Sequence, residues 1–375
     1  MSAPRPERDL HVRAPAASPH TAHVIADDTE ALAVAARPAA RFAPGSARRD
    51  AERLLPRAEL DELSASGLLA VTVPRAHGGA DVTARTLGEI VRLLSAADAS
   101  IGQIPQNHFF FVEVLKENGT PAQQAFFQAE LLAGKRFGNA LAEKGTRHAL
   151  EFTTHLTERP DGSYLLSGVK NYATSALFAD WIPVFARGAD DRLTAAFLPY
   201  DAPGVEVVDD WDGIGRRTTA SGTVRLTDVV VPADRVVPHH LTFERPEVFG
   251  AFGQFIHAAV DTGIARAALD EGGELVRTLA RPWGEAGVDR AAEEPLVVQK
   301  FGELALLVRS AEALLEKLGD AIDAARRTLA DPAAATEASL AVTAARAQAD
   351  TAAVTVASDV FALIGTRAAT REHNF

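Results

Sequence analysis

The chain has 375 residues, no cysteine and a formal net charge of −12 at pH 7. The lack of cysteine excludes disulfides, cysteine-ligated zinc and thiol nucleophiles, and the acidic charge argues against a nucleic-acid partner. With 47% hydrophobic residues but no continuous run of eighteen, the composition indicates a cytoplasmic globular protein without a membrane-spanning helix.

Residues 1–24 contain Arg, Pro and Ala but no apolar segment of the kind found in secretory signals. We therefore expect a disordered tail there. Residues 25–133 are predicted to form a helical domain. One helix follows Asp27, and another is predicted over Pro121–Leu132. Between them, apolar residues recur at helical spacing at Leu87, Ile90, Val91 and Leu94.

Residues 134–243 change to the pattern of a β domain. Glu158–Ser163 has the composition of a hairpin turn between two strands. The spacing of the runs predicts a small antiparallel barrel or sandwich. Strands are predicted over residues 152–157, 164–169, 180–185, 193–198, 205–208 and 223–231.

Residues 244–375 are rich in alanine and again have helical periodicity. Asp331-Pro332 interrupts this pattern, which resumes over Ala335–Ala362. Long helices with small side chains are typical of a four-helix bundle. A β domain between two helical zones favours a flat ligand in the clefts where they meet.

Two motifs have simple structural explanations. Gly213-Ile-Gly215 begins like a dinucleotide fingerprint, but it lacks the third glycine and lies between strands. His239 and His240 would face opposite sides of an extended segment, so no metal site is expected. His108 lies in an aromatic helical stretch, where a buried core histidine is the simpler interpretation of the residue alone.

Two segments of the β domain favour ligand chemistry. Residues 138–145 are strand-like, and Asn139 is a polar residue among small apolar ones there. Tyr172 is followed by the hydroxyls of Thr174 and Ser175. An aromatic ring could back a planar ligand while the hydroxyls bind its edge. An ordinary turn at the end of a strand is the alternative.

These segments resemble the acyl-CoA dehydrogenase superfamily. The resemblance covers residues 25–375 and is carried by Gly67–Gly79, Lys170–Ser175, Gly215–Pro232 and Val360–Gly365. It implies an α+β fold with an N-terminal helical domain, a central antiparallel β-barrel domain and a C-terminal four-helix bundle. The implied boundaries are 25–133, 134–243 and 244–375.

The closer resemblance is to the flavin monooxygenase branch, which includes the dibenzothiophene monooxygenases and sulfur-acquisition oxidoreductases. It is carried by Ile104–Phe109, Phe137–Ala140, Tyr172–Thr174, Thr219–Thr223 and Ala280–Gly284. The branch implies reduced FMN, with FAD as the alternative, supplied by a separate NAD(P)H flavin reductase. It also implies O2, a flavin hydroperoxide, a small organosulfur or aromatic substrate, and a homotetramer.

The resemblance assigns roles to particular residues. Asn139, Ser175 and His108 would be catalytic, by holding the ring edge, stabilising the peroxy group and assisting proton transfer, in that order. Arg281 would reach a flavin phosphate in the neighbouring subunit. No metal is implied. The implied cofactor-binding residues are Asn139, Leu141, Ala142, Tyr172, Thr174, Ser175, Arg281 and Trp283.

Two other functions stay open. An FAD-dependent acyl-CoA dehydrogenase needs a carboxylate base, yet Gly253–Ala259, one family position for it, contains no acid. The other family position, and a histidine used by the monooxygenase branch, lie beyond Phe375, so we expect a truncated or divergent C-terminus. A non-catalytic flavoprotein on the same scaffold is the remaining alternative.

Overall fold

The computed structural model describes residues 22–148, 151–188, 190–328, 331–370, 373 and 375. Most of the expected tail, residues 1–21, lies outside this set. Ala22 is only 4% exposed, and the amide of His23 donates to Ala65 O at 2.9 Å. The packed N-terminal zone therefore begins before residue 25, earlier than we predicted.

The N-terminal zone is helical, as predicted. Thr120 and Gln123 form a reciprocal capping box with Pro121 in the first turn, which explains why that helix begins where the sequence indicates. Thr83 caps α4 by accepting from the amide of Thr86. The helices are α1 Asp28–Phe42, α2 Ser46–Glu52, α3 Arg57–Ala65, α4 Ala84–Ala97, α5 Ala99–Gln103, α6 Gln106–Asn118 and α7 Pro121–Leu132.

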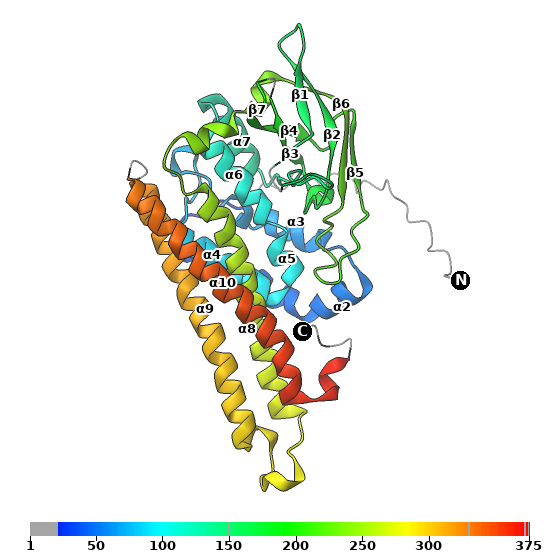
Figure 1. Ribbon diagram of the computed structural model, residues 1–375, viewed down its shortest axis with the longest axis vertical. Coiled ribbons are helices and arrows are strands. Elements are labelled where there is room, and N and C mark those ends of the chain that lie inside the picture. The colour runs from blue at the N-terminus through cyan, green and yellow to red at the C-terminus, as the bar shows by residue number, and fades with distance from the viewer. Residues whose placement is uncertain (1–21, 149–150, 189, 329–330, 371–372, 374) are drawn as a thin grey trace, which may run out of the picture.

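The central zone forms a seven-stranded sheet in the order β5-β6-β2-β1-β3-β4-β7. Figure 1 shows it at one end of the molecule, next to α6 and α7. The six predicted strands are present, and the short β7 was not predicted. The strands are β1 His155–Glu158, β2 Tyr164–Lys170, β3 Trp181–Arg187, β4 Leu193–Pro199, β5 Val205–Val208, β6 Thr223–Val231 and β7 Val236–Val237.

The sheet differs from the antiparallel barrel that we predicted. β1 and β3 run parallel and pair through His155 and Arg187, so the sheet is mixed. Residues 138–145 were expected to be strand-like. Phe137 and Ala140 make isolated bridges to β3, and the segment is not a named strand. Small residues let it lie close to its neighbours: a Cβ on Gly138 would be 2.8 Å from the Cα of Ala176.

Three long helices form the C-terminal zone, and α4 from the N-terminal zone packs against two of them. They are α8 Phe249–Thr278, α9 Pro295–Arg327 and α10 Pro332–Ile364. Asp331 caps α10 and Pro332 is its first residue, as the break in the sequence pattern predicted. Since α4 contacts α8 and α9, the fourth helix of the expected bundle comes from a distant part of the chain (Figure 1).

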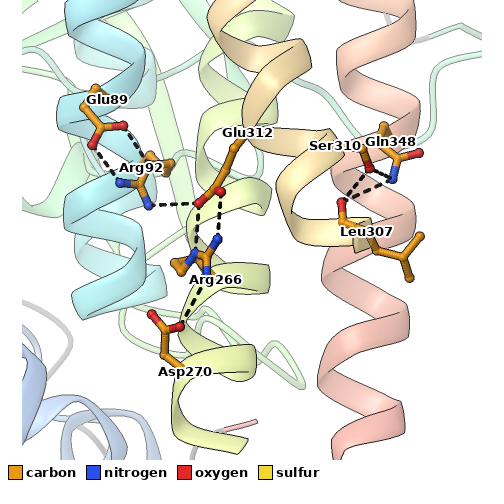
Figure 2. Close-up of polar contacts among 8 residues, drawn as sticks. All are labelled: Glu89, Arg92, Arg266, Asp270, Leu307, Ser310, Glu312 and Gln348. Carbon is orange, nitrogen blue, oxygen red and sulfur yellow. Dashed lines mark hydrogen bonds and ion pairs between the residues drawn. The ribbon is translucent and has the colours of Figure 1, made fainter. Parts of the chain in front are cut away.

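A shared carboxylate joins three of these helices. Glu312 of α9 accepts two hydrogen bonds from Arg266 of α8, at 2.9 and 2.7 Å. The same carboxylate lies 3.5 Å from Arg92 of α4, which Glu89 also holds (Figure 2). Bidentate pairing of this kind adds orientation to the apolar packing, and so specifies how α4 lies across the bundle.

Contrary to the expectation from the sequence, α10 is long and apolar enough by composition to be a candidate membrane span. It contacts α8 and α9 along its length (Figure 1). A third of its most apolar 18-residue stretch is buried within this single chain. Alanine produces most of the apolar character, and alanine also permits close helix packing. The composition is that of a bundle helix.

The close approach of α8 to α4 can be tested by substitution of Gly263. A Cβ there would lie 2.5 Å from Arg92 O and 2.7 Å from the Cβ of Ser95. Gly263→Ala is therefore expected to destabilise the fold by about 1–3 kcal/mol, because two helix backbones must separate. Urea unfolding measures this change. Gly302→Ala in α9 is the matched control: nothing lies within 4 Å of its Cβ position, so it should leave stability unchanged or raise it slightly.

Candidate active site

A cavity of about 370 Å³ lies where α5 meets the loops at one end of the sheet. Most of its wall comes from the β domain, through the segment after β2 and the loop before β6. It has the size of a small-molecule site. The described residues that line it are Gln103, Tyr172, Thr174, Trp211, Gly215, Arg216, Thr219 and Ser221.

The segment after β2 turns sharply at this cavity. Tyr172 and Ser175 both have left-handed backbones, with φ of 54° and 67°. Backbone bonds hold the turn: Ala173 N donates to Gly222 O at 2.9 Å, and Ser175 N donates to Thr219 O at 3.3 Å. Non-glycine residues adopt this conformation at a cost of about 1–2 kcal/mol, and such strain gathers at ligand sites.

Three hydroxyls form a chain along one wall. Thr174 Oγ1 lies 2.7 Å from Ser221 Oγ, which lies 2.8 Å from Thr219 Oγ1. Thr219 in turn donates to Arg216 O at 3.0 Å, so Ser221 must donate to Thr219 and Thr174 must donate to Ser221, because each hydroxyl has a single proton. The chain therefore presents the lone pairs of Thr174 Oγ1, as an acceptor, to a ligand beside it.

Two aromatic rings form another part of the wall. Tyr172 is 50% exposed, and its ring centre lies 6.4 Å from that of Trp211 at an interplanar angle of 78°. Trp211 is fixed by donation from Nε1 to Arg216 O at 3.1 Å. The Lys144 ammonium lies 5.0 Å from the centre of the Tyr172 ring. The exposed part of this ring is a surface on which a planar ligand could stack.

The charged side of the cavity is Arg216. Its guanidinium donates to Gln103 Oε1 at 3.0 Å and to Asp261 Oδ1 at 3.0 Å. The other Asp261 oxygen accepts from Arg346 of α10. Burial, with the positive charges of Arg346 and Arg216, lowers the pKa of His257 one turn earlier on α8, so this imidazole stays neutral at pH 7.

Asn139 and Ser175 lie beside the turned segment and carry unused polar atoms. Asn139 is 5% exposed and donates from Nδ2 to Tyr172 O at 3.1 Å, whereas its Oδ1 has no partner among the described residues. Ser175 is 4% exposed, and its Oγ is also without a partner in that set. Buried polar atoms usually have a partner, so these two are available to a ligand beside Tyr172 and Thr174.

His108 does not fit the catalytic role that the resemblance implied. Phe137 N donates to its Nδ1 at 3.0 Å, so the ring proton must lie on Nε2, which is 2.7 Å from Leu69 O. Burial lowers its pKa to about 4. Both nitrogens are therefore engaged by the main chain in a neutral ring, as in the simpler interpretation of a core histidine that joins α6 to the segment before Asn139.

The remaining predicted residues divide into two groups. Leu141 and Ala142 lie next to the turned segment: Lys170 Nζ donates to Leu141 O at 3.1 Å, and Asn171 N donates to Ala142 O at 2.8 Å. Arg281 and Trp283 lie on the loop after α8, at the far end of the bundle from the sheet (Figure 1). Trp283 is 77% exposed, and neither residue lines the cavity of its own chain.

The sequence reasoning missed part of the cavity wall. Gln103, Trp211 and Arg216 were not proposed as site residues. Arg216 lies in the loop that begins like a dinucleotide fingerprint. This loop turns toward the cavity because Arg216 and Ala220 both adopt left-handed backbones, each with φ of 48°. Backbone strain of this kind does not leave a pattern in the residue types.

Comparisons with known proteins agree with this architecture. Models of the acyl-CoA dehydrogenase N-terminal, middle and C-terminal domains match residues 27–135, 139–229 and 255–375. The dibenzothiophene monooxygenase of Rhodococcus erythropolis is 32% identical over 96% of this chain and 90% of its own. The chain belongs to the acyl-CoA dehydrogenase superfamily.

Two further members of the superfamily are informative about ligands. The crystal structure of FMN-bound TdsC from Paenibacillus sp. A11-2 has a TM-score of 0.86 and 30% identity, and the match covers 91% of this chain and 89% of TdsC. The probable FMNH2-dependent monooxygenase SfnC of Pseudomonas putida is 29% identical over 79% of this chain and 74% of its own.

Proposed function

We propose that this member of the superfamily is a reduced-FMN-dependent monooxygenase of organosulfur compounds. The observation that carries the proposal is the pair of unpartnered buried atoms, Asn139 Oδ1 and Ser175 Oγ, next to the cavity residues Tyr172 and Thr174. The relatives named for dibenzothiophene oxygenation and FMNH2 dependence, and the FMN-bound structure of TdsC, supply the reaction class and the cofactor. We extend the substrate class to small aromatic compounds.

The residues present fit a flavin. The turned segment places the exposed Tyr172 ring at the cavity, and the hydroxyl of Thr174 at its wall donates to Ser221 and can accept from a ligand. A planar ring stacked on Tyr172 would have a polar edge within reach of such groups. The unpartnered atoms of Asn139 and Ser175 would complete its hydrogen bonding.

Bound reduced FMN would supply the electrons that activate O2 for transfer of one oxygen atom to the substrate. The side chains of this protein would bind the flavin and orient it toward the substrate. Tyr172 packs against one face of the ring, and Thr174 binds its polar edge. Asn139 and Ser175, whose side chains are both buried, would hold the oxygen that is to be transferred and limit its contact with water.

Further partners follow from this function. A two-component enzyme of this type needs a separate flavin reductase, which we propose to use NAD(P)H. We also propose a cytoplasmic homotetramer. In its support, Leu306, Leu340 and Val354 of the long helices are 69%, 62% and 63% exposed in the single chain. A second copy could also bring Arg281 and Trp283 to a neighbour's flavin phosphate, which they do not approach in their own chain.

The dehydrogenase alternative has less support. Asp261 is the acid nearest to the expected position on α8, two residues after Gly253–Ala259. One of its oxygens accepts from Arg216 and the other from Arg346, so neither is free to remove a proton from an acyl thioester. No observation favours the non-catalytic alternative over the monooxygenase.

Anaerobic titration tests the proposed function directly. The purified chain is expected to bind reduced FMN more tightly than reduced FAD, measured by absorbance under argon. Addition of O2 and dibenzothiophene should then give an S-oxide, measured by chromatography. Retention of tightly bound FAD that is bleached by an acyl-CoA would establish the dehydrogenase instead. A chain that binds neither flavin in either redox state would be a scaffold protein.

A further inference from the structure

Arg216 is the one charged side chain among the described residues that line the cavity. It is 34% exposed, and its guanidinium has five N–H donors. Gln103 and Asp261 each take one of them, at 3.0 Å. Further N–H groups are therefore left to donate to a ligand in the cavity, from a guanidinium that is already fixed in place.

The cluster behind Arg216 has an excess of positive charge. Arg216 and Arg346 share the single carboxylate of Asp261, and His257 beside them is neutral at pH 7 because burial lowers its pKa. The adjacent Arg217 points elsewhere, toward the backbone oxygens of Asp50 and Ala51. Among these two guanidinium groups, one carboxylate and one neutral imidazole, one positive charge is unmatched, and partial burial weakens its screening by water.

We infer that Arg216 binds the anionic pyrimidine edge of reduced flavin and so makes the site prefer reduced over oxidised FMN. This inference rests on the proposed function. The reduced isoalloxazine ring loses a proton near neutral pH and becomes a monoanion, whereas the oxidised ring is neutral. A fixed positive charge stabilises only the former, and protein charge near the pyrimidine part is a known means of tuning a flavin.

The ring is a better ligand for this guanidinium than the phosphate. Arg216 shares its cavity with Tyr172 and Trp211, the aromatic side chains on which a planar ring would stack. Asp261 neutralises one of the two guanidinium charges, so a single positive charge is left for the ligand. A single charge matches a delocalised monoanion better than it matches a phosphate, which carries close to two negative charges. A site with this charge would take reduced FMN from the reductase and release the oxidised product.

The test compares dissociation constants of oxidised and reduced FMN in the wild type, Arg216→Gln and Arg217→Gln, measured anaerobically at one pH and ionic strength. Arg216→Gln is expected to lower the preference for reduced FMN about tenfold, equivalent to a potential of bound flavin about 30 mV more negative. Arg217→Gln removes the same charge from the next residue and should keep the wild-type preference. Asp261 keeps Arg346 as its partner in Arg216→Gln, so no buried carboxylate is left unpaired.

Riboflavin, which has the ring without the phosphate, distinguishes the two anionic parts of FMN. The same loss of preference is expected for riboflavin. If Arg216→Gln instead weakens both redox forms of FMN equally and leaves riboflavin unchanged, the guanidinium binds the phosphate and the inference is overturned. An unchanged preference also overturns it. Arg216→Lys, which keeps the charge, should retain most of the preference and serves if the Gln variant does not fold. Failure of the wild type to bind any flavin would remove the proposed function itself.

Discussion

Lys170→Met is expected to lower the free energy of unfolding by about 3–5 kcal/mol, because it leaves a buried carboxylate without its cation. The Lys170 side chain is fully buried and lies 2.7 Å from Glu143, which is 3% exposed. The ammonium also donates to Leu141 O at 3.1 Å and lies 4.4 Å from the centre of the Phe152 ring. Methionine can fill the space but supplies neither charge nor donors.

Urea unfolding of two further variants separates the pair from the space that it fills. Glu143→Gln combined with Lys170→Met should lose less stability than Lys170→Met alone, because a neutral amide can still accept from Thr153 N, which donates to Glu143 at 2.7 Å. Lys300→Met is the surface control: its partner Asp359 is 38% exposed, so the change should stay within about 1 kcal/mol. Equal losses for Lys170→Met and Lys300→Met would contradict the role of the buried pair.

The same pair predicts an acid-sensitive step. Burial by itself would raise the pKa of Glu143, but hydrogen bonds from Lys170, Thr153 and Thr154 lower it to about 2 from 4.5. A folded-state pKa below the unfolded value stabilises the fold above pH 4.5, and that stabilisation is lost as the pH falls toward about 2. The stability difference between wild type and Lys170→Met should therefore shrink over this range.

Consequences for the site follow from the position of the pair. Lys170 holds Leu141 O, and Asn171 N holds Ala142 O at 2.8 Å, so the segment after Asn139 is tied to the segment before Tyr172. The strained turn at the cavity is supported by these bonds from one side and by Thr219 and Gly222 from the other. Strain of this kind persists only where the surroundings determine it, so Lys170→Met is also expected to weaken flavin affinity through the turn.

Elements with a local cause were predicted well from the sequence. Pro121–Leu132 begins at a capping box with proline in its first turn, and β5 and β6 have the predicted bounds. The parallel pairing of β1 with β3 was not predictable, because it joins residues 32 positions apart that are separated by a hairpin turn and the whole of β2. The same holds for α4, whose place beside α8 depends on small residues such as Gly263 in the partner helix.

The candidate site was predicted unevenly for a similar reason. Tyr172 and Thr174 lie in one short segment that also carries the family resemblance, and the structure places both at the cavity. Arg216 reaches the same cavity only because the loop before β6 folds back with a left-handed residue. His108 was included in the predicted site because Ile104–Phe109 resembles a segment of the monooxygenase branch. In the structure, its two ring nitrogens bind the main chain. Residue type and order do not reveal which polar atoms the fold leaves unpaired.

Ser175→Ala and Asn139→Ala are expected to uncouple flavin oxidation from substrate oxygenation. Removing a polar group that holds a reacting oxygen lowers the rate of the step by about 10²–10³-fold, so reduced FMN would then be oxidised with release of hydrogen peroxide. The measurement is the ratio of S-oxide formed to hydrogen peroxide released per reduced FMN consumed. Unchanged coupling in both variants would remove these residues from the proposed mechanism.

Stability distinguishes this role from a structural one, most clearly for Ser175. Its Oγ has no partner among the described residues, and burial of such a hydroxyl costs about 1–3 kcal/mol. Ser175→Ala should therefore leave the melting temperature unchanged or raise it, while coupling falls. Ser64 of α3 also has an unpartnered hydroxyl in that set, but unlike Ser175 it is not adjacent in the chain to a residue that lines the cavity, so Ser64→Ala should retain coupling. We therefore expect the ligand to be the partner of the Ser175 hydroxyl, and a fall in melting temperature on removal of that hydroxyl would contradict this assignment.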